Sequence, residues 1–312
     1  MGGTWTTQNK VRPGVYINFQ QTSMETDELH RGIITMPLNL DFGPEQEVIE
    51  VTQNTDTLPI FGEELYNLVP IREGLKRAEK VLVYRLNTMA DGSKAAVTEG
   101  NLTATAKYTG TKGNDLKITI EAEGENFNVK TFIGTKLVDL QQGVKNVQDL
   151  QDNEFVVFTG SDSLTATAGV SLTGGINGTV ASENYTAYRE AIEVYYFNTC
   201  ALYDVTDIGI KDAFKQWIKR LRDDEGNKVV LVAENYSNAN YEGIISVKNG
   251  VVLEDGTTLE AKKATAWVAG ATAAANTNKS LTYDFYDGAV DVDKKYNYSA
   301  IESAINDGEF LF

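Results

Sequence analysis

Few side chains in this chain are suited to catalysis at neutral pH. A serine or cysteine nucleophile needs a base that titrates near neutrality, and the single histidine, His30, stands in the polar stretch DELHRG. We interpret His30 as an exposed or capping residue. The single cysteine, Cys200, lies in the apolar stretch YYFNTCALY and cannot form an internal disulfide, so we interpret it as a small core residue. The sequence therefore predicts no catalytic residue.

Patterns that bind cofactors or metals are equally scarce. GGING at 174–178 lacks the spacing of a phosphate-binding loop or of a dinucleotide fold, and we interpret it as a flexible joint. Asp287, Asp291 and Asp293 stand together in DGAVDVD, but a calcium loop needs its glycine and final glutamate at other positions. A solvated acidic loop is predicted. Carboxylates are numerous enough for an acid–base pair to form in the fold, which a single sequence cannot locate. We predict neither a cofactor nor a metal.

Composition bounds the class of protein. The chain has 312 residues, 42% of them hydrophobic and 23% charged, which is an ordinary globular balance. Its net charge of −16 opposes direct binding of nucleic acid, which relies on clustered Lys and Arg. No basic-then-apolar start or run of about 18 apolar residues is present. We expect no membrane insertion. We also expect the protein to be made in a cytoplasm and to stay there until something larger releases it.

Helix and strand patterns alternate at both ends of the chain. RGIITMPLNL and KVLVYRL read as strands, and LPIFGEELYNLVPIREGLKRA reads as two helices, with Pro70 suited to start the second. Later, ENYTAYREAIEVYYFNTCALY and IKDAFKQWIKRLRDDEGNKVVLVAEN each read as a helix followed by a strand. In the latter, Phe214, Trp217, Ile218 and Leu221 form one apolar stripe, with Lys211, Lys215 and Lys219 turned elsewhere.

Two further predictions concern the C-terminal third. IISVKNGVVLEDG is predicted to be a β-hairpin with Asn249-Gly250 at its turn. TTLEAKKATAWVAGATAAA is predicted to be a helix, because Thr257 and Glu260 have the spacing of a capping box.

The middle of the chain has a different character. From 91 to 178 it is rich in Thr, Gly, Asn and Asp, with short alternating runs such as LKITIEA, NFNVKTFI and EFVVFTG, which indicate a β-rich module. The stretch GVSLTGGINGTV is predicted to be a glycine-rich return linker. The fold class is therefore α/β (α+β): a discontinuous main domain, 23–90 and 179–312, interrupted by the inserted module 91–178.

An N-terminal strand has no local partner. In VRPGVYINF, apolar residues alternate with polar ones, yet both flanks are polar and offer no second strand for a hairpin. The strand either joins the edge of its own domain's sheet or pairs with another chain, and Pro13 suits the start of a strand or an edge. We treat 1–22 as an arm, and its candidate pairing residues are Val11, Pro13, Gly14, Val15, Tyr16, Ile17, Asn18 and Phe19.

Three stretches carry a family resemblance. GGTWTTQNKVRPGVYINF, YTGTKGNDLKITIE and ATAWVAGATAAANTNKSLTYDFYDGAVDV resemble, in order, the contractile tail sheath proteins of phages and of R-type bacteriocins of Gram-positive hosts, including diffocin-type particles. The family's main domain carries a subtilisin-like label, which concerns fold and not activity. Members normally continue beyond the equivalent of AINDGEFLF with a C-terminal arm. We therefore expect this chain, which stops at Phe312, to be a truncated or short member, and a monomer if truncated.

The resemblance implies a structural, non-enzymatic function. Sheath subunits form a helical lattice around a tail tube, joined to a baseplate, and contract to drive the tube through a cell envelope. Extended arms add strands to a neighbour's sheet, which favours pairing of residues 11–19 between chains. Such a protein is assembled in a bacterial host's cytoplasm and ends in a virion tail or bacteriocin particle. The alternatives are a cytoplasmic α/β enzyme, which a substrate-sized pocket with convergent titratable groups would support, and an extracellular adhesin.

Overall fold

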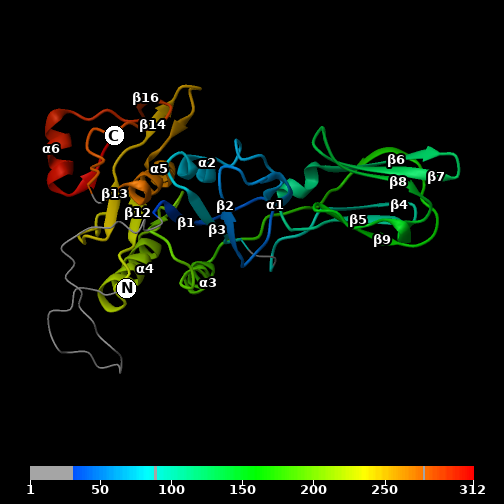
Figure 1. Ribbon diagram of the computed structural model, residues 1–312, viewed down its shortest axis with the longest axis horizontal. Helices are drawn as coiled ribbons and strands as arrows, with labels where there is room; N and C mark the ends of the chain where they lie inside the picture. Colours follow the sequence, from blue (N-terminus) through cyan, green and yellow to red (C-terminus); the bar gives the residue numbers. More distant parts are fainter. Residues whose placement is uncertain (1–30, 88–89, 277) are drawn as a thin grey trace, which may run out of the picture. The chain divides into compact units, whose positions relative to one another are not determined.

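Two structural units are built from interleaved parts of the chain. The computed structural model describes residues 31–87, 90–276 and 278–312. The first unit contains the described residues up to Met36, with Glu73–Leu82 and Tyr195–Phe312. The second contains Pro37–Arg72 and Val83–Val194, and so includes the whole of 91–178. Both units therefore combine segments that lie far apart in the sequence (Figure 1).

A parallel sheet forms the centre of the first unit. Its strand order is β17-β13-β12-β11-β1-β3, and β17, β13, β12, β11 and β1 pair in parallel. These strands are β1 (Ile33–Leu38), β3 (Lys80–Arg85), β11 (Thr199–Ala201), β12 (Val230–Glu234), β13 (Ile244–Val247) and β17 (Glu309–Phe310). The strands predicted from RGIITMPLNL and KVLVYRL are confirmed as β1 and β3.

Helices connect and cover these strands. They are α2 (Val69–Leu75), α4 (Ile208–Lys219), α5 (Ala261–Ala274) and α6 (Tyr298–Asn306), and α4 continues as a π-helix over Arg220–Asp224. The helix α5 contacts β11, β12 and β13. It approaches the end of α2 closely, because a Cβ built on Gly270 would lie 2.4 Å from the carbonyl oxygen of Gly74. Glycine is therefore needed at position 270 for the two backbones to pack.

The stripe on α4 is buried as predicted, with one exception. Phe214, Trp217, Ile218 and Leu221 are all buried. Lys211, predicted to turn away, is only 2% exposed and forms an ion pair of 2.6 Å with Glu234 at the end of β12. The prediction for Lys211 was wrong because a lysine next to the stripe can be buried when a carboxylate forms an ion pair with its ammonium group.

The predicted hairpin is also wrong. Its two strands belong to different sheets: β13 is parallel to β12, whereas β14 (Val251–Leu253) pairs antiparallel with β15 (Thr258–Leu259) and β16 (Ala289–Val292). A Cβ on Gly250 would lie 1.8 Å from the carbonyl oxygen of Leu259. This glycine therefore permits a close backbone approach rather than a tight turn.

The start of α5 differs from the predicted capping box. The helix begins at Ala261, and Glu260 is its N-cap without a side-chain capping bond. Thr257 precedes the strand β15, in which Leu259 is buried and pairs with Val251. Burial of Leu259 in the sheet outweighs the local helix signal that begins at Thr257.

The second unit contains two stacked sheets. One has the order β10-β6-β7-β8 and the other β4-β5-β9 (Figure 1). The strands are β4 (Ala96–Glu99), β5 (Leu102–Ala106), β6 (Leu116–Glu123), β7 (Asn126–Ile133), β8 (Lys136–Val144), β9 (Val156–Gly160) and β10 (Thr167–Ser171). Apolar residues of both sheets form one core, to which Phe42 and Leu58 also contribute. The unit further contains β2 (Val48–Val51), α1 (Leu58–Phe61) and α3 (Ser182–Ile192).

Two chain segments run side by side where this β-rich stretch begins and ends. Ser93 and Ile176 exchange backbone hydrogen bonds of 3.0 and 3.1 Å, and the Thr179 amide donates to Asp91. The predicted return linker is therefore partly wrong, because its first residues, Gly169–Ser171, belong to β10, in which Val170 and Ser171 pair with β6. Glycine content alone did not reveal this pairing.

Candidate functional site

The residues singled out from the sequence differ in whether the structure describes them. Val11, Pro13, Gly14, Val15, Tyr16, Ile17, Asn18 and Phe19 lie outside the described residues, as does His30. Cys200 is fully buried in β11, which confirms its interpretation as a core residue. Among residues 31–87, 90–276 and 278–312, no group of three or more His, Cys, Asp or Glu side chains is arranged to hold a metal ion.

The three aspartates of DGAVDVD have separate partners. Asp287 accepts hydrogen bonds from Arg77 and Trp267, Asp291 pairs with Lys295, and Asp293 accepts from the amide of Gly250. The prediction of a solvated acidic loop is therefore wrong for Asp287, which joins α5 to the end of α2.

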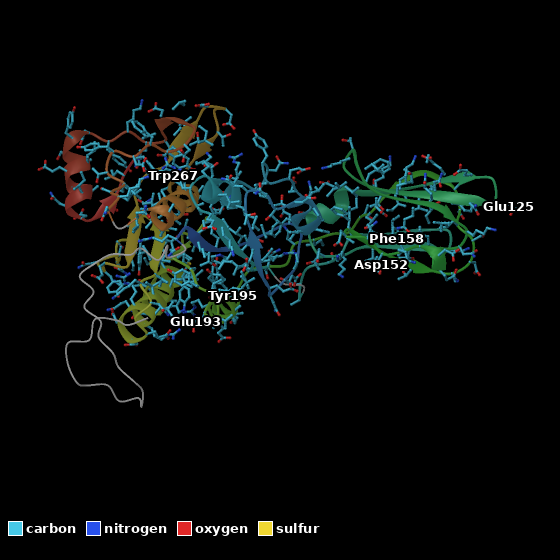
Figure 2. The ribbon with its side chains drawn as sticks, viewed as in Figure 1. Glu125, Asp152, Phe158, Glu193, Tyr195 and Trp267 are labelled. Atoms are coloured by element: carbon cyan, nitrogen blue, oxygen red, sulfur yellow. The ribbon has the colours of Figure 1, made fainter. Side chains whose placement is uncertain are left out.

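Asp287 is the centre of a polar cluster in the first unit. Its Oδ2 atom lies 2.5 Å from Nε of Arg77 and 2.8 Å from Nε1 of Trp267, and Lys76 donates to its backbone carbonyl at 2.9 Å. Trp267 is 1% exposed and lies within α5 (Figure 2). A buried indole N–H needs an acceptor, and Asp287 provides it.

A buried glutamate extends the cluster. Glu73, in α2, is fully buried; it pairs with Lys76 at 2.7 Å and accepts a 2.5 Å hydrogen bond from the Tyr286 hydroxyl. The Tyr286 ring stacks on Trp267, with 4.6 Å between ring centroids, and also contacts Phe312. The segment before β16 is thus attached to α2 and α5 by both polar and aromatic contacts.

The charges in this cluster alter each other's ionisation. The hydrogen bond to Asp287 raises the pKa of Arg77 above its ordinary value. Partial burial raises the pKa of Asp287. The hydrogen bonds from Arg77 and Trp267 and the nearby positive charges together lower this pKa by more than burial raises it, so the net shift is downward. Both groups therefore stay charged at neutral pH. Such an arrangement is suited to holding a segment in place and not to transferring protons.

Two aromatic side chains project from the segment that this cluster holds. Tyr283 is 95% exposed and Phe285 is 83% exposed, whereas Tyr286 is buried. Tyr283 has a φ of 62°, a left-handed conformation that costs energy for a residue with a side chain. Large exposed aromatic residues are typical of surfaces that bind another protein.

An open cavity of about 590 Å³ lies at the carboxyl ends of the parallel strands. It is lined by residues that include Glu234, Lys248, Asp293 and Lys262 at the start of α5. This edge of a parallel sheet is where α/β enzymes bind their ligands. The lining charges already have partners, however. Lys211 pairs with Glu234, Glu309 with Lys248, and Asp204 with Lys262.

Sequence reasoning missed the cluster around Asp287. Its members lie up to 214 positions apart, from Glu73 and Arg77 to Trp267 and Asp287, and no local pattern joins them. One signal was present: Trp267 in a helix rich in small residues needs an acceptor for its indole N–H. That need does not indicate which carboxylate supplies it.

Three family models match the chain one after another. The Tail sheath protein Gp18 domain III N-terminal region matches residues 31–86, the Phage tail sheath protein beta-sandwich domain matches 90–177, and the Phage tail sheath protein central domain matches 178–312. Together they cover nearly all of the described residues.

Individual proteins agree with these models. Two Bacillus subtilis proteins, the Phage-like element PBSX protein XkdK and the uncharacterized protein YqbK, are each 38% identical over 100% of this chain and 71% of their own length. The crystal structure of a sheath tail protein from Desulfitobacterium hafniense is 46% identical, with a TM-score of 0.87 over 96% of this chain and 71% of that one. A sheath tail protein from Listeria innocua is 36% identical, with a TM-score of 0.77 over 90% and 65% of the two chains.

Proposed function

The chain belongs to the phage tail sheath protein family, and on that premise we propose that its copies polymerise around a tail tube and contract to drive the tube through a cell envelope. The observation that carries this proposal is the succession of three sheath family models over 31–312. As a tail sheath subunit, the protein has a structural role. Contraction would proceed by reorientation of rigid subunits, a known route for large switching transitions.

The arm and the domain division complete this proposal. Residues 1–22 form an arm whose strand, with Val15, Ile17 and Phe19 alternating, adds to the sheet of a neighbouring copy. The described part of the parallel sheet supports this proposal. Its edge strand, β17, is only two residues long, and a short edge strand leaves that edge available for a strand from another copy. The main domain is 23–90 with 179–312, and the inserted module is 91–178. The family model for a β-sandwich domain over 90–177 supports this division.

We further propose that the protein has no catalytic activity and needs no metal or cofactor. The ion pairs that engage the charges of the 590 Å³ cavity support this. Other sheath subunits, a tail tube protein and a baseplate are the proposed partners, without direct contact to nucleic acid. The particle is a phage tail or an R-type bacteriocin assembled in the host cytoplasm. Among the described residues, no helix has the length and apolarity to cross a bilayer.

Electron microscopy tests the sheath function. The natural full-length protein, expressed alone or beside its tube protein, is expected to form straight, striated, hollow cylinders. Persistent monomers under every condition would contradict polymerisation. Calorimetric titration with calcium and with zinc tests the absence of a metal site, and stoichiometric binding at micromolar affinity would overturn that part.

Deletion of residues 1–22 tests the arm. The thermal midpoint of the monomer is expected to stay almost unchanged, because such an arm is ordered by the interface and not by its own domain. In the natural full-length protein the same deletion should abolish sheath formation. Ile17→Pro should act like the deletion, since it removes a backbone donor within the strand, and Thr7→Pro in the polar lead is the matched control. Unfolding of the monomer after the deletion would mean that the strand belongs to its own sheet.

Excision tests the domain division. In this variant a short Gly-Ser linker replaces 91–178. Phe42 and Leu58 are also changed to serine, because they pack into the module's core. The product should be a soluble domain that unfolds cooperatively. Loss of all folded signal in circular dichroism would mean that the two parts share one indispensable core.

A further inference from the structure

The segment before β16 presents two large aromatic rings to solvent. We define residues 282–285 as the aromatic loop. Along it, Tyr283 and Phe285 are exposed, whereas Asp284 between them is only partly exposed and points its carboxylate at cations of the same unit. Both rings are therefore on the surface, two positions apart in the chain, and the backbone between them is held by contacts of Asp284.

Hydrogen bonds hold the aromatic loop in place. The Asp284 amide donates to the carbonyl of Leu281 at 3.0 Å, and its carboxylate accepts from the amide of Phe285 at 2.9 Å. Arg77 donates to the carbonyl of Phe285 at 3.0 Å, and the neighbouring Tyr286 is stacked on Trp267. Because these contacts fix the backbone, a partner that binds the rings loses little additional conformational entropy. The left-handed conformation of Tyr283 is maintained by the same contacts.

The charges beneath the loop cancel. Asp284 and Asp287 face Arg77 and Lys279, with N–O distances of 3.4 Å for Arg77–Asp284, 2.5 Å for Arg77–Asp287 and 3.1 Å for Lys279–Asp284. Two carboxylates are thus matched by two cations. The chain as a whole carries a net charge of −16, so two copies repel each other over most of their surfaces. A neutral, aromatic patch is a place where two copies can approach without that repulsion.

We propose that the aromatic loop is a contact surface for a second copy of this chain, with Tyr283 and Phe285 as the residues that anchor it. The proposal rests on the proposed function, in which copies assemble into a polymer. The contact is head to tail: the loop of one copy meets a different surface of the next, as an open helical assembly requires. Rigid aromatic anchors of this kind dominate the energetics of many protein interfaces.

Photo-cross-linking of the full chain tests the contact directly. With the photoreactive residue p-benzoylphenylalanine in place of Tyr283, irradiation of concentrated protein should give a covalent dimer of twice 34.2 kDa. The matched control carries the same residue in place of Tyr298 on α6, which is 92% exposed, and should give at least tenfold less dimer. No dimer from position 283, equal dimer from both positions, or cross-linking of position 283 to the tube protein in preference to a second copy would each overturn the proposal.

A double variant separates this proposal from the proposed function. Tyr283→Ser with Phe285→Ser should weaken self-association in sedimentation experiments by about thirtyfold or more, as loss of interface anchors does, while Tyr298→Ser should not. If the wild type and the double variant form the same cylinders, the aromatic loop is not the contact and the sheath function stands. If the wild type forms no cylinders, the sheath function fails, and the cross-links from position 283 still decide whether the loop binds a second copy.

Discussion

Removing the Asp287 carboxylate should destabilise the first unit strongly. Asp287→Ala deletes two charge-assisted hydrogen bonds, to Arg77 and Trp267, and leaves the Trp267 indole N–H buried without an acceptor. Hydrogen bonds to a charged group contribute about 1.5–3 kcal/mol each. Because the Asp287 side chain is 42% exposed, water offsets part of the loss, and we expect a total decrease in the free energy of unfolding of about 2–4 kcal/mol.

Urea unfolding, followed by tryptophan fluorescence and circular dichroism, measures this loss. With a slope of about 2 kcal/mol per molar urea, the midpoint should fall by roughly 1–2 M. Asp291→Ala is the matched control, since that carboxylate pairs with the exposed Lys295, and its midpoint should stay within experimental scatter. The reasoning is refuted if Asp287→Ala shifts the midpoint no more than Asp291→Ala does.

The same variant has a defined pH dependence. The pKa of Asp287 in the folded protein lies below its ordinary value of 3.8, so its carboxylate contributes stability above that pH and loses the contribution as pH falls through the lower, folded value. The difference between the wild type and Asp287→Ala should therefore be constant from about pH 7 to 5 and shrink below about pH 4. A difference that grows on acidification would contradict the assignment.

Three further substitutions test the packing and burial described above. Gly270→Ala places a Cβ 2.4 Å from the carbonyl oxygen of Gly74 in α2 and should cost about 1–3 kcal/mol in thermal unfolding. Gly209→Ala on α4 is the control, because its Cβ would meet only the side chain of Asp207, at 3.2 Å, and it should cost clearly less. Tyr286→Phe removes a hydroxyl that donates to a buried carboxylate and should cost about 1.5–3 kcal/mol in urea unfolding. Lys211→Met leaves the Glu234 carboxylate without its buried cation and should cost about 3–5 kcal/mol, and adding Glu234→Gln should recover part of that loss; no recovery would mean that the pair is not coupled.

Elements with a strong local period were predictable from the sequence. The apolar stripe of α4 and the continuous apolar run of β3 identify one helix face and one buried strand, because burial repeats at 3.6 residues in the first and covers both faces in the second. Asn249-Gly250 misled the prediction, since the pair is common in turns. Here Asn249 is buried, and its side chain bonds the backbone of Phe312 and Lys294.

The candidate site could not be predicted in the same way. Asp287 stands in a stretch whose local composition is that of an exposed acidic loop, and only the folded chain brings Arg77 within 2.5 Å of it. The exposure of Tyr283 and Phe285 is equally non-local, because LTYDFYDG alternates like a strand and the burial of Tyr286 depends on Trp267 and Phe312. Local pattern gives the elements, whereas long-range contacts decide which side chains remain on the surface.

The pairing of Ser93 with Ile176 has a consequence for how such genes change. Because the two residues exchange backbone hydrogen bonds, the segment between them begins and ends at neighbouring points in space. A replacement segment therefore has to fit the short gap between these adjacent residues, and its core has to accept Phe42 and Leu58, which pack against this stretch from outside it. The flanking residues and the intervening segment are therefore expected to change together at these two contact positions, even where the rest of the segment varies in length.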